Sequence, residues 1–204
     1  IDLDPHDAKA HYNLVSILAS RGTTEEAIGQ LRAAVRIDPY DVKARNNLGY
    51  FLASTGRTRE AEEQYRQALE ISPDDSSANY NLADLLAADG RLDEAIKHYE
   101  KAIRGRPEWP AAHYSLGLAL QRLGKIEQAV ESYEEALRLD KNRLDAANNL
   151  AWIYSTHWDG AVRNPKEAVR LAERVNSATG GQAPGALDTL AAAYASAGRY
   201  TQAA

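Results

Sequence analysis

The chain has 204 residues, of which 44% are hydrophobic and 26% are charged, a composition typical of globular proteins. No apolar run approaches the length that crosses a bilayer, so we expect no direct membrane insertion. The formal net charge of −5 argues against nucleic acid or an anionic membrane surface as the main partner. The absence of cysteine excludes disulfides, thiol nucleophiles and cysteine-ligated metals, but leaves the compartment unknown.

Four series of residues recur along the chain with one common spacing of 34 residues. They are Pro5, Pro39, Pro73 and Pro107; Leu14, Leu48, Leu82, Leu116 and Leu150; Gly22, Gly56, Gly90 and Gly124; and Ala27, Ala61, Ala95 and Ala129. Internal repeats of this length predict a solenoid.

Residues 42–75 show what one repeat consists of. Apolar residues fall three, four and seven positions apart on both sides of Gly56, which predicts two amphipathic helices, called here helix A and helix B. A glycine just past a helix can take the left-handed conformation that closes the last turn. Pro73 is expected to end helix B, and Asp75 places an acidic side chain at the start of the next helix A.

We expect one array made of complete and partial repeats. The expected boundaries are residues 1–7 (tail of a preceding repeat), 8–41, 42–75, 76–109, 110–143, 144–183 (with an insertion near 155–164) and 184–204 (partial). Both ends interrupt a repeat, so the chain reads as a fragment of a longer protein.

Thr23 and Glu26 have the spacing of a capping box at the start of a helix B. Lys141 replaces the repeated proline, so the end of that helix B is expected to be less sharply defined.

The fifth repeat departs from the common spacing. Ala168 follows Ala129 by 39 residues, which leaves five extra residues in a longer turn. Asn164 and Pro165 then have the pattern of a helix N-cap followed by a first-turn proline. For Trp158, in the longer turn, we expect a ring packed over the adjacent helix pair.

The residues of the second repeat resemble the tetratricopeptide repeat family. Its motif is matched by Leu48, Gly49, Leu52, Gly56, Ala61, Tyr65, Ala68 and Pro73. The resemblance implies an all-α fold, a right-handed α-solenoid of tetratricopeptide helix-turn-helix repeats, in which helices A line the concave side. One helix A position that is often Trp in the family departs consistently, and packing there is expected to be looser or locally different. It holds His11, Arg45, Asn79, His113, Ala147 and Leu187.

The inward-facing helix A positions implied by this resemblance are rich in Asn and Tyr, with Trp152 among them. The peptide-binding candidates are Asn13, Asn47, Asn81, Asn149, Tyr12, Asn46, Tyr50, Tyr80, Tyr114, Lys9 and Lys43. Asn13, Asn47, Asn81 and Asn149 share one position, where a carboxamide can pair with the amides and carbonyls of an extended peptide. The row is similar to the asparagine ladder of O-linked N-acetylglucosamine transferases. Alternatively, these amides bond to neighbouring helices.

Other kinds of site are poorly supported. A clamp for a terminal carboxylate, as in some chaperone-binding members, is incomplete, because Tyr12, Asn46, Tyr80 and Asn81 stand where Lys and Arg would be needed. The five histidines show no metal-ligand spacing, and the repeated glycines are turn glycines rather than a phosphate-binding loop. We therefore expect no catalytic residues, no metal and no cofactor.

The sequence thus predicts a non-catalytic scaffold that binds an extended peptide or protein segment along the concave groove. One alternative is the substrate-recruiting arm of a larger enzyme, such as a glycosyltransferase. Another is a self-assembling scaffold. Weak self-association is expected through the partly exposed Leu187, Leu190 and Tyr194 at the interrupted end.

Overall fold

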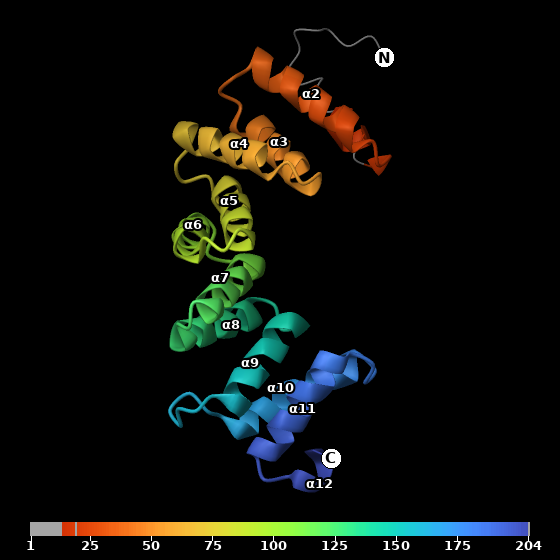
Figure 1. The fold of residues 1–204 in the computed structure, drawn as a ribbon, viewed down its shortest axis with the longest axis vertical. Coiled ribbons are helices and arrows are strands. Elements are labelled where there is room, and N and C mark those ends of the chain that lie inside the picture. The colour runs from red at the N-terminus through yellow and green to blue at the C-terminus, as the bar shows by residue number, and fades with distance from the viewer. Residues whose placement is uncertain (1–13, 19, 204) are drawn as a thin grey trace. The chain divides into compact units, whose positions relative to one another are not determined.

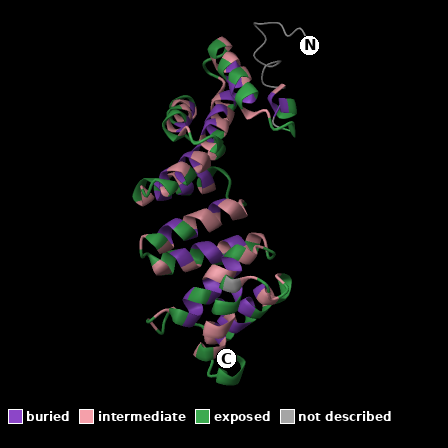
Figure 2. Cartoon of the chain, turned by 45° about the vertical axis from the view of Figure 1, so that its right-hand side comes forward, coloured by how far each residue is buried: buried purple, intermediate pink, exposed green. Residues whose placement is uncertain are grey.

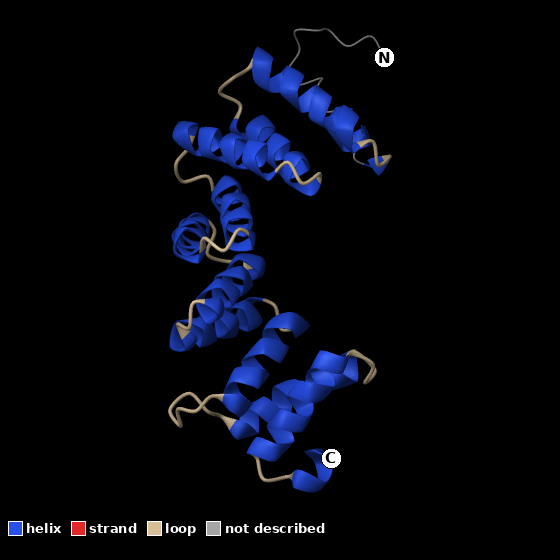
Figure 3. Cartoon of the chain, viewed as in Figure 1, coloured by secondary structure: helices blue, strands red, loops and turns tan. Residues whose placement is uncertain are grey.

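A computed structural model describes residues 14–18 and 20–203, and every regular element in these ranges is an α-helix (Figures 1 and 3). The named helices are α2 (Thr24–Ile37), α3 (Val42–Ser54), α4 (Thr58–Ile71), α5 (Ser76–Ala88), α6 (Leu92–Gly105), α7 (Pro110–Arg122), α8 (Ile126–Leu139), α9 (Leu144–Thr156), α10 (Pro165–Ala178), α11 (Pro184–Ser196) and α12 (Tyr200–Ala203). No helix in the described part of the chain is both long and apolar enough to traverse a lipid bilayer.

Two compact units, Ile1–Pro107 and Glu108–Ala204, make up the chain, and each is described by itself. In the first unit, helices A and B pair as α3 with α4 and α5 with α6, while α2 packs on α3 and α4 packs on α5. In the second unit, α7 pairs with α8 and α9 with α10, and α11 contacts both α9 and α10. Within each unit, therefore, a helix pair buries its apolar faces between its own two helices and against the neighbouring helices of the same unit.

Turns and caps explain why the helices begin and end where they do. Gly56 has φ +78° and Gly90 has φ +81°, the left-handed conformation expected after helix A. At the start of α5, the Asp75 carboxylate accepts a hydrogen bond from the backbone N–H of Ala78 at 2.8 Å. Asp41 caps α3 in the same way. These acidic caps satisfy backbone N–H groups that have no partner within the helix.

Two expectations about helix ends are wrong. Thr23 forms no side-chain cap on α2: its hydroxyl donates to the Leu18 carbonyl at 3.1 Å, and its oxygen accepts no backbone N–H of the helix. Helix α8 ends cleanly at Leu139 although Lys141 replaces the proline. The reason is local: the Asp140 carboxylate accepts from the backbone N–H of Asn142 at 3.0 Å and fixes the turn without a proline.

The core is built from small residues against large ones. Ala61, Ala95 and Ala129 on helices B are fully buried, and so is the ring of Tyr133. Figure 2 shows such buried positions as purple stretches that alternate with exposed green ones along the helices. Because helices approach to about 8–10 Å depending on the side chains at the crossing, these alanines set the spacing within each pair.

The fifth repeat contains the expected longer turn. Helix α9 ends at Thr156 and α10 begins at Pro165, and the loop between them is visible in Figure 3. The Asn164 side chain accepts from the backbone N–H of Glu167 at 3.2 Å, so the expected N-cap and first-turn proline are confirmed. The Asn164 N–H bonds to the Tyr154 carbonyl at 3.0 Å and anchors the end of the loop to α9.

The last described helix pair is incomplete, because α12 is only four residues long. Leu187 on α11 is exposed, and Leu190 and Tyr194 are half-buried, as expected. Self-association through these side chains stays a prediction.

Candidate functional site

The candidate residues of the first unit lie on helices α3 and α5. Asn46 and Asn47 on α3, and Tyr80 and Asn81 on α5, are half-buried. Asn81 donates from Nδ2 to Oδ1 of Asn46 at 3.0 Å, which links helices A of consecutive repeats. Lys43 is exposed in the first turn of α3. Three further candidates, Lys9, Tyr12 and Asn13, lie outside the described residues.

Tyrosines of this unit pack between helix A and helix B. The Tyr80 ring on α5 meets the Tyr99 ring on α6 edge to face, with centroids 5.8 Å apart. The Tyr99 hydroxyl donates to the Asp84 carboxylate at 2.5 Å. One flank of Tyr80 is therefore held by its own repeat. Edge-to-face packing of this kind gives the ring a fixed orientation at the surface.

The second unit repeats this arrangement with Tyr114 on α7 and Tyr133 on α8, whose ring centroids are 5.9 Å apart. Asn149 on α9 donates from Nδ2 to the Tyr133 hydroxyl at 3.3 Å, and that hydroxyl donates to Gln121 at 2.7 Å. Burial raises the pKa of Tyr133, so its hydroxyl stays protonated as a donor. The guanidinium of Arg143 lies over the Tyr114 ring, 4.7 Å from its centroid.

These contacts describe the asparagine row within each unit. Asn81 bonds to the preceding helix A, and Asn149 bonds to the preceding helix B. Both side chains are also half-buried rather than fully buried, so each keeps a surface that solvent or a ligand can reach. A carboxamide has two donor hydrogens and an acceptor oxygen, and one contact to a neighbouring helix does not saturate it.

Large apolar side chains are exposed at one further helix A position. Tyr50 on α3 is 57% exposed, Leu118 on α7 is 38% exposed and Trp152 on α9 is 43% exposed. All three occupy equivalent positions of their repeats, and Asp84 holds that position in the third repeat. We call Tyr50, Asp84, Leu118 and Trp152 the helix A exposed position. The sequence places Leu118 and Trp152 at inward-facing helix A positions, and their distance along the chain from Tyr50, a multiple of 34 residues, is the signal that adds them to the binding candidates.

Trp158 does not cover its own helix pair, contrary to expectation. Its side chain is 87% exposed, and its one ring neighbour in the described structure is His157, at a centroid distance of 5.6 Å. The loop is folded around Asp159, whose carboxylate accepts from the Ala161 N–H at 2.8 Å. This turn, together with the anchored end at Asn164, directs the indole away from the core.

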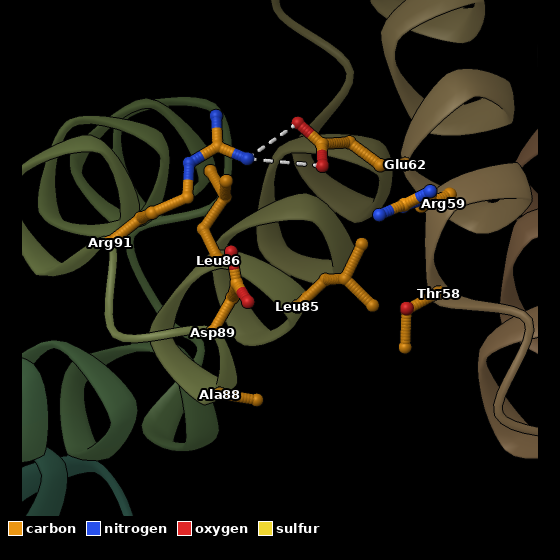
Figure 4. Close-up of a pocket in the computed structure, with 8 residues that line it drawn as sticks. All are labelled: Thr58, Arg59, Glu62, Leu85, Leu86, Ala88, Asp89 and Arg91. Carbon is orange, nitrogen blue, oxygen red and sulfur yellow. Dashed lines mark hydrogen bonds and ion pairs between the residues drawn. The ribbon is translucent and has the colours of Figure 1, made fainter.

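A cavity of about 590 Å³ lies in the first unit beside α4, α5 and the start of α6 (Figure 4). Figure 4 shows the Arg91 guanidinium bonded to both oxygens of the Glu62 carboxylate, at 2.9 and 3.0 Å, above Leu85 and Leu86. Arg91 also bonds to Glu94 at 2.8 Å. Arg91, one of the two arginines that line this cavity, is thus neutralised by the protein's own carboxylates, which suits a structural ion pair better than a ligand site.

Metal-binding geometry is not found among the described residues: no group of three or more His, Asp or Glu side chains is placed to hold an ion. His98, which is half-buried, instead bonds through Nδ1 to Oδ1 of Asn79 at 2.8 Å. Burial lowers the pKa of His98, with Lys101 and Arg66 acting in the same direction. This histidine therefore has a packing role between α5 and α6.

The helix-turn-helix repeats, the left-handed glycines and the small residues at the crossings define an all-α repeat protein of the tetratricopeptide class. Family models confirm this: two described as Tetratricopeptide repeat match residues 1–42 and 74–142, and one described as TPR repeat matches residues 50–90. The chain belongs to the tetratricopeptide repeat family. Members of this family generally mediate protein–protein interactions and are typically non-catalytic.

Solved structures with the same fold cover most of the chain. MamA residues 41 to the end, from Desulfovibrio magneticus RS-1, has 23% identity and a TM-score of 0.75, covering 89% of this chain and 99% of that one. PilF of Pseudomonas aeruginosa has 25% identity and a TM-score of 0.79, covering 96% and 86%. A tetratricopeptide repeat protein from Parabacteroides merdae has 21% identity and a TM-score of 0.74, covering 96% and 75%. None of the curated proteins compared with the chain matches it.

Proposed function

We propose that this protein is a non-catalytic scaffold that binds an extended segment of a protein partner along the faces of its helices A. The observation that carries the proposal is the helix A exposed position. Tyr50 is 57% exposed and Trp152 is 43% exposed, so neither ring is packed into the core between the helices. Aromatic side chains exposed on a repeat surface are the residues that most often anchor a partner.

The half-buried amides give the second part of the proposal. Asn47, Asn81 and Asn149 occupy one equivalent position in the second, third and fifth repeats, one turn before the helix A exposed position. We assign them contacts to the main chain of the bound segment, which would hold it irrespective of its sequence. Selectivity would then come from the apolar anchors at Tyr50, Leu118 and Trp152.

A peptide array probed with this chain tests the proposal. For a peptide that binds, Tyr50→Ala and Trp152→Ala are each expected to weaken binding by about tenfold or more, as anchor residues do. Tyr40→Ala is the matched control, since Tyr40 is 77% exposed but lies in the turn before α3. A loss of the same size for the control would contradict the assignment of the helix A face.

The amides are tested separately by the double substitution Asn47→Ala and Asn81→Ala. Weaker peptide binding, with a loss of stability no greater than that of Asn81→Ala alone, supports main-chain recognition. Equal losses of binding and of thermal stability would instead assign these amides to packing between helices, as the bond between Asn81 and Asn46 illustrates.

A further inference from the structure

In the second repeat, the side chain of Arg45 on helix A reaches helix B and forms hydrogen bonds with acceptors there. Arg45 on α3 donates from Nη1 to Oε1 of Gln67 at 2.5 Å and to Oε1 of Gln64 at 3.3 Å, both on α4. Its Nε donates to the Pro39 carbonyl at 2.8 Å. The Nε and Nη1 atoms of this guanidinium thus find neutral acceptors between the two helices.

An equivalent pair follows in the third repeat. In the third repeat, Asn79 stands in place of Arg45, bonds to His98 at 2.8 Å and donates to the Pro73 carbonyl at 3.0 Å. The position that often holds Trp in the family is therefore locally different here, because polar residues cross to helix B.

The fifth repeat lacks this pair. Ala147 replaces the crossing residue, and Leu171 and Arg174 stand where the second repeat has Gln64 and Gln67. Arg174 is half-buried, and its Nε and Nη2 atoms are buried without a hydrogen-bond partner among the described residues. A buried donor without an acceptor is costly, and more so when it is charged.

Arg174 lines a cavity of about 390 Å³ between α8, α9 and α10. The charged side chains around it are Arg138, Lys141, Arg170, Arg174, Glu134 and Glu167. Four cations face these two carboxylates and Glu135, which pairs with Arg138, so the formal charge is +1, in a chain whose net charge is −5. The cavity is therefore a local positive site on an acidic protein.

The two other arginines of the cavity are already paired on their own helices. Arg138 bonds to Glu135 at 2.6 and 2.7 Å, and Arg170 bonds to Glu167 at 2.5 and 2.8 Å. The Nε and Nη2 atoms of Arg174 have no such partner among the described residues. Burial followed by the charge of Arg170 lowers the pKa of Arg174, although the Glu167 carboxylate acts in the opposite direction. An anion in the cavity would balance the charge of Arg174 and accept hydrogen bonds from its unpaired nitrogens.

We propose that this cavity binds a carboxylate, carried by an Asp or Glu side chain of a protein partner, with Arg174 as the principal contact and Lys141 at the rim. A guanidinium matches the planar geometry of a carboxylate. Glu134 and Glu167 on the cavity wall disfavour the second negative charge of a phosphate. This site is separate from the helix A faces and does not depend on the function proposed above.

The test uses the whole chain, labelled with ¹⁵N at arginine, and follows the side-chain Nε–H resonances by NMR. The probe is an acetylated and amidated pentapeptide of alternating Gly and Glu, and the same peptide with Gln in place of Glu is the neutral control. The Glu peptide is expected to shift the Arg174 resonance, identified by its loss in Arg174→Gln. Arg174→Gln is expected to weaken binding by about tenfold or more, as loss of a charge-assisted contact does.

Arg174→Gln places in the fifth repeat the residue that the second repeat has there, Gln67, so we expect it to fold; circular dichroism checks this. The matched control is Arg45→Gln, which removes an arginine whose acceptors are already supplied. No shift with the Glu peptide, or equal weakening by both substitutions, would overturn the site. Tighter binding of inorganic phosphate than of the Glu peptide would overturn the carboxylate assignment.

Discussion

Asn81 on α5 donates a hydrogen bond to Asn46 on α3 at 3.0 Å, and so joins helices A of two consecutive repeats within the first unit. Both side chains are half-buried, so the bond competes with solvent and its net contribution should be about 0.5–1.5 kcal/mol. We expect Asn81→Ala and Asn46→Ala each to lower the free energy of unfolding by about this amount, as measured by urea denaturation.

The double substitution separates this bond from other effects. If the two amides interact mainly with each other, the combined loss should be clearly smaller than the sum of the single losses. Simple additivity would show that the bond contributes nothing to stability, and would leave both amides available to a ligand.

The close contact between Gly49 and Tyr65 gives a second prediction. A Cβ atom added at Gly49 would lie 2.5 Å from Cε1 of Tyr65, a ring that is only 2% exposed. Gly49→Ala should therefore destabilise the chain by about 1–3 kcal/mol in thermal or urea unfolding, through overpacking. The third repeat has Ala83 at the position of Gly49 and Tyr99 at the position of Tyr65, and there the Tyr99 hydroxyl is bonded to Asp84. The fold therefore accepts a Cβ atom at this position when the tyrosine ring shifts slightly. We expect the cost of Gly49→Ala to lie near the lower end of this range.

Gly29 is the matched control for this substitution. It lies inside α2 with nothing within 4 Å of an added Cβ, so Gly29→Ala should stabilise the helix by about 0.5–1 kcal/mol. Destabilisation by both substitutions would mean that helix propensity and steric space do not determine how Gly→Ala changes the free energy of unfolding at these positions.

Fully buried alanines on helices B support a third prediction. Ala61 and Ala95 have no exposed surface, so Ala61→Leu or Ala95→Leu should cost roughly 1–3 kcal/mol and lower the melting temperature. Ala88, exposed at the end of α5, is the control, and Ala88→Leu should leave the melting temperature nearly unchanged. An unchanged melting temperature for the buried substitutions would place the packed face elsewhere.

The helices were predictable because their signals are local and repeated. Gly56 ends one helix and Asp75 caps another through backbone geometry that depends on a few adjacent residues. The two wrong expectations about helix ends also have local causes. The Thr23 hydroxyl bonds to the Leu18 carbonyl in the preceding turn and accepts no N–H of α2, and the Asp140 carboxylate fixes a turn that lacks the repeated proline.

Contacts between repeats were not predictable in the same way. The sequence shows Arg45, Asn79, His113 and Ala147 at one position, but not that the first two cross to acceptors on helix B. Spacing within one helix cannot tell which residue of another helix stands opposite. The unpaired nitrogens of Arg174 therefore became visible only from the structure.

The position of Trp158 shows a further limit of the sequence. A large apolar side chain on a long turn usually gains by covering apolar surface. Here the turn is fixed by the Asp159 carboxylate and by the bond from the Asn164 N–H to the Tyr154 carbonyl. This backbone geometry, which sequence patterns do not encode, leaves the indole exposed.

The exposure of Trp158 gives a fourth prediction. Its side chain is 87% exposed, so Trp158→Phe should change the free energy of unfolding by less than about 0.5 kcal/mol. The chain has three tryptophans, and Trp158 should be the one most accessible to acrylamide, so the substitution should remove most of the easily quenched fluorescence. Trp109→Phe is the control, because Trp109 is half-buried. Unchanged quenching in Trp158→Phe would show that the ring packs against the protein in solution.

The ion pair between Arg91 and Glu62 makes stability depend on pH. Burial acts to raise the pKa of Glu62, but hydrogen bonds from Arg66 and Arg91 outweigh it, so the pKa is lowered from its usual 4.5. In this pH range the unfolded chain binds more protons at this site than the folded chain does. The stabilisation is therefore present above pH 4.5 and is lost as the pH falls through the lower pKa of the folded state.

Glu62→Gln should accordingly reduce the free energy of unfolding at neutral pH by up to about 1 kcal/mol, since the pair is partly exposed to solvent. The difference from the unmodified chain should shrink towards zero at about pH 3, where the carboxyl is protonated in both states. Urea denaturation at several pH values measures this difference. Glu70→Gln, at an exposed position of the same helix, should show little effect at any pH. A difference that grows as the pH falls would mean that Glu62 is not stabilised by its arginine partners in the folded chain.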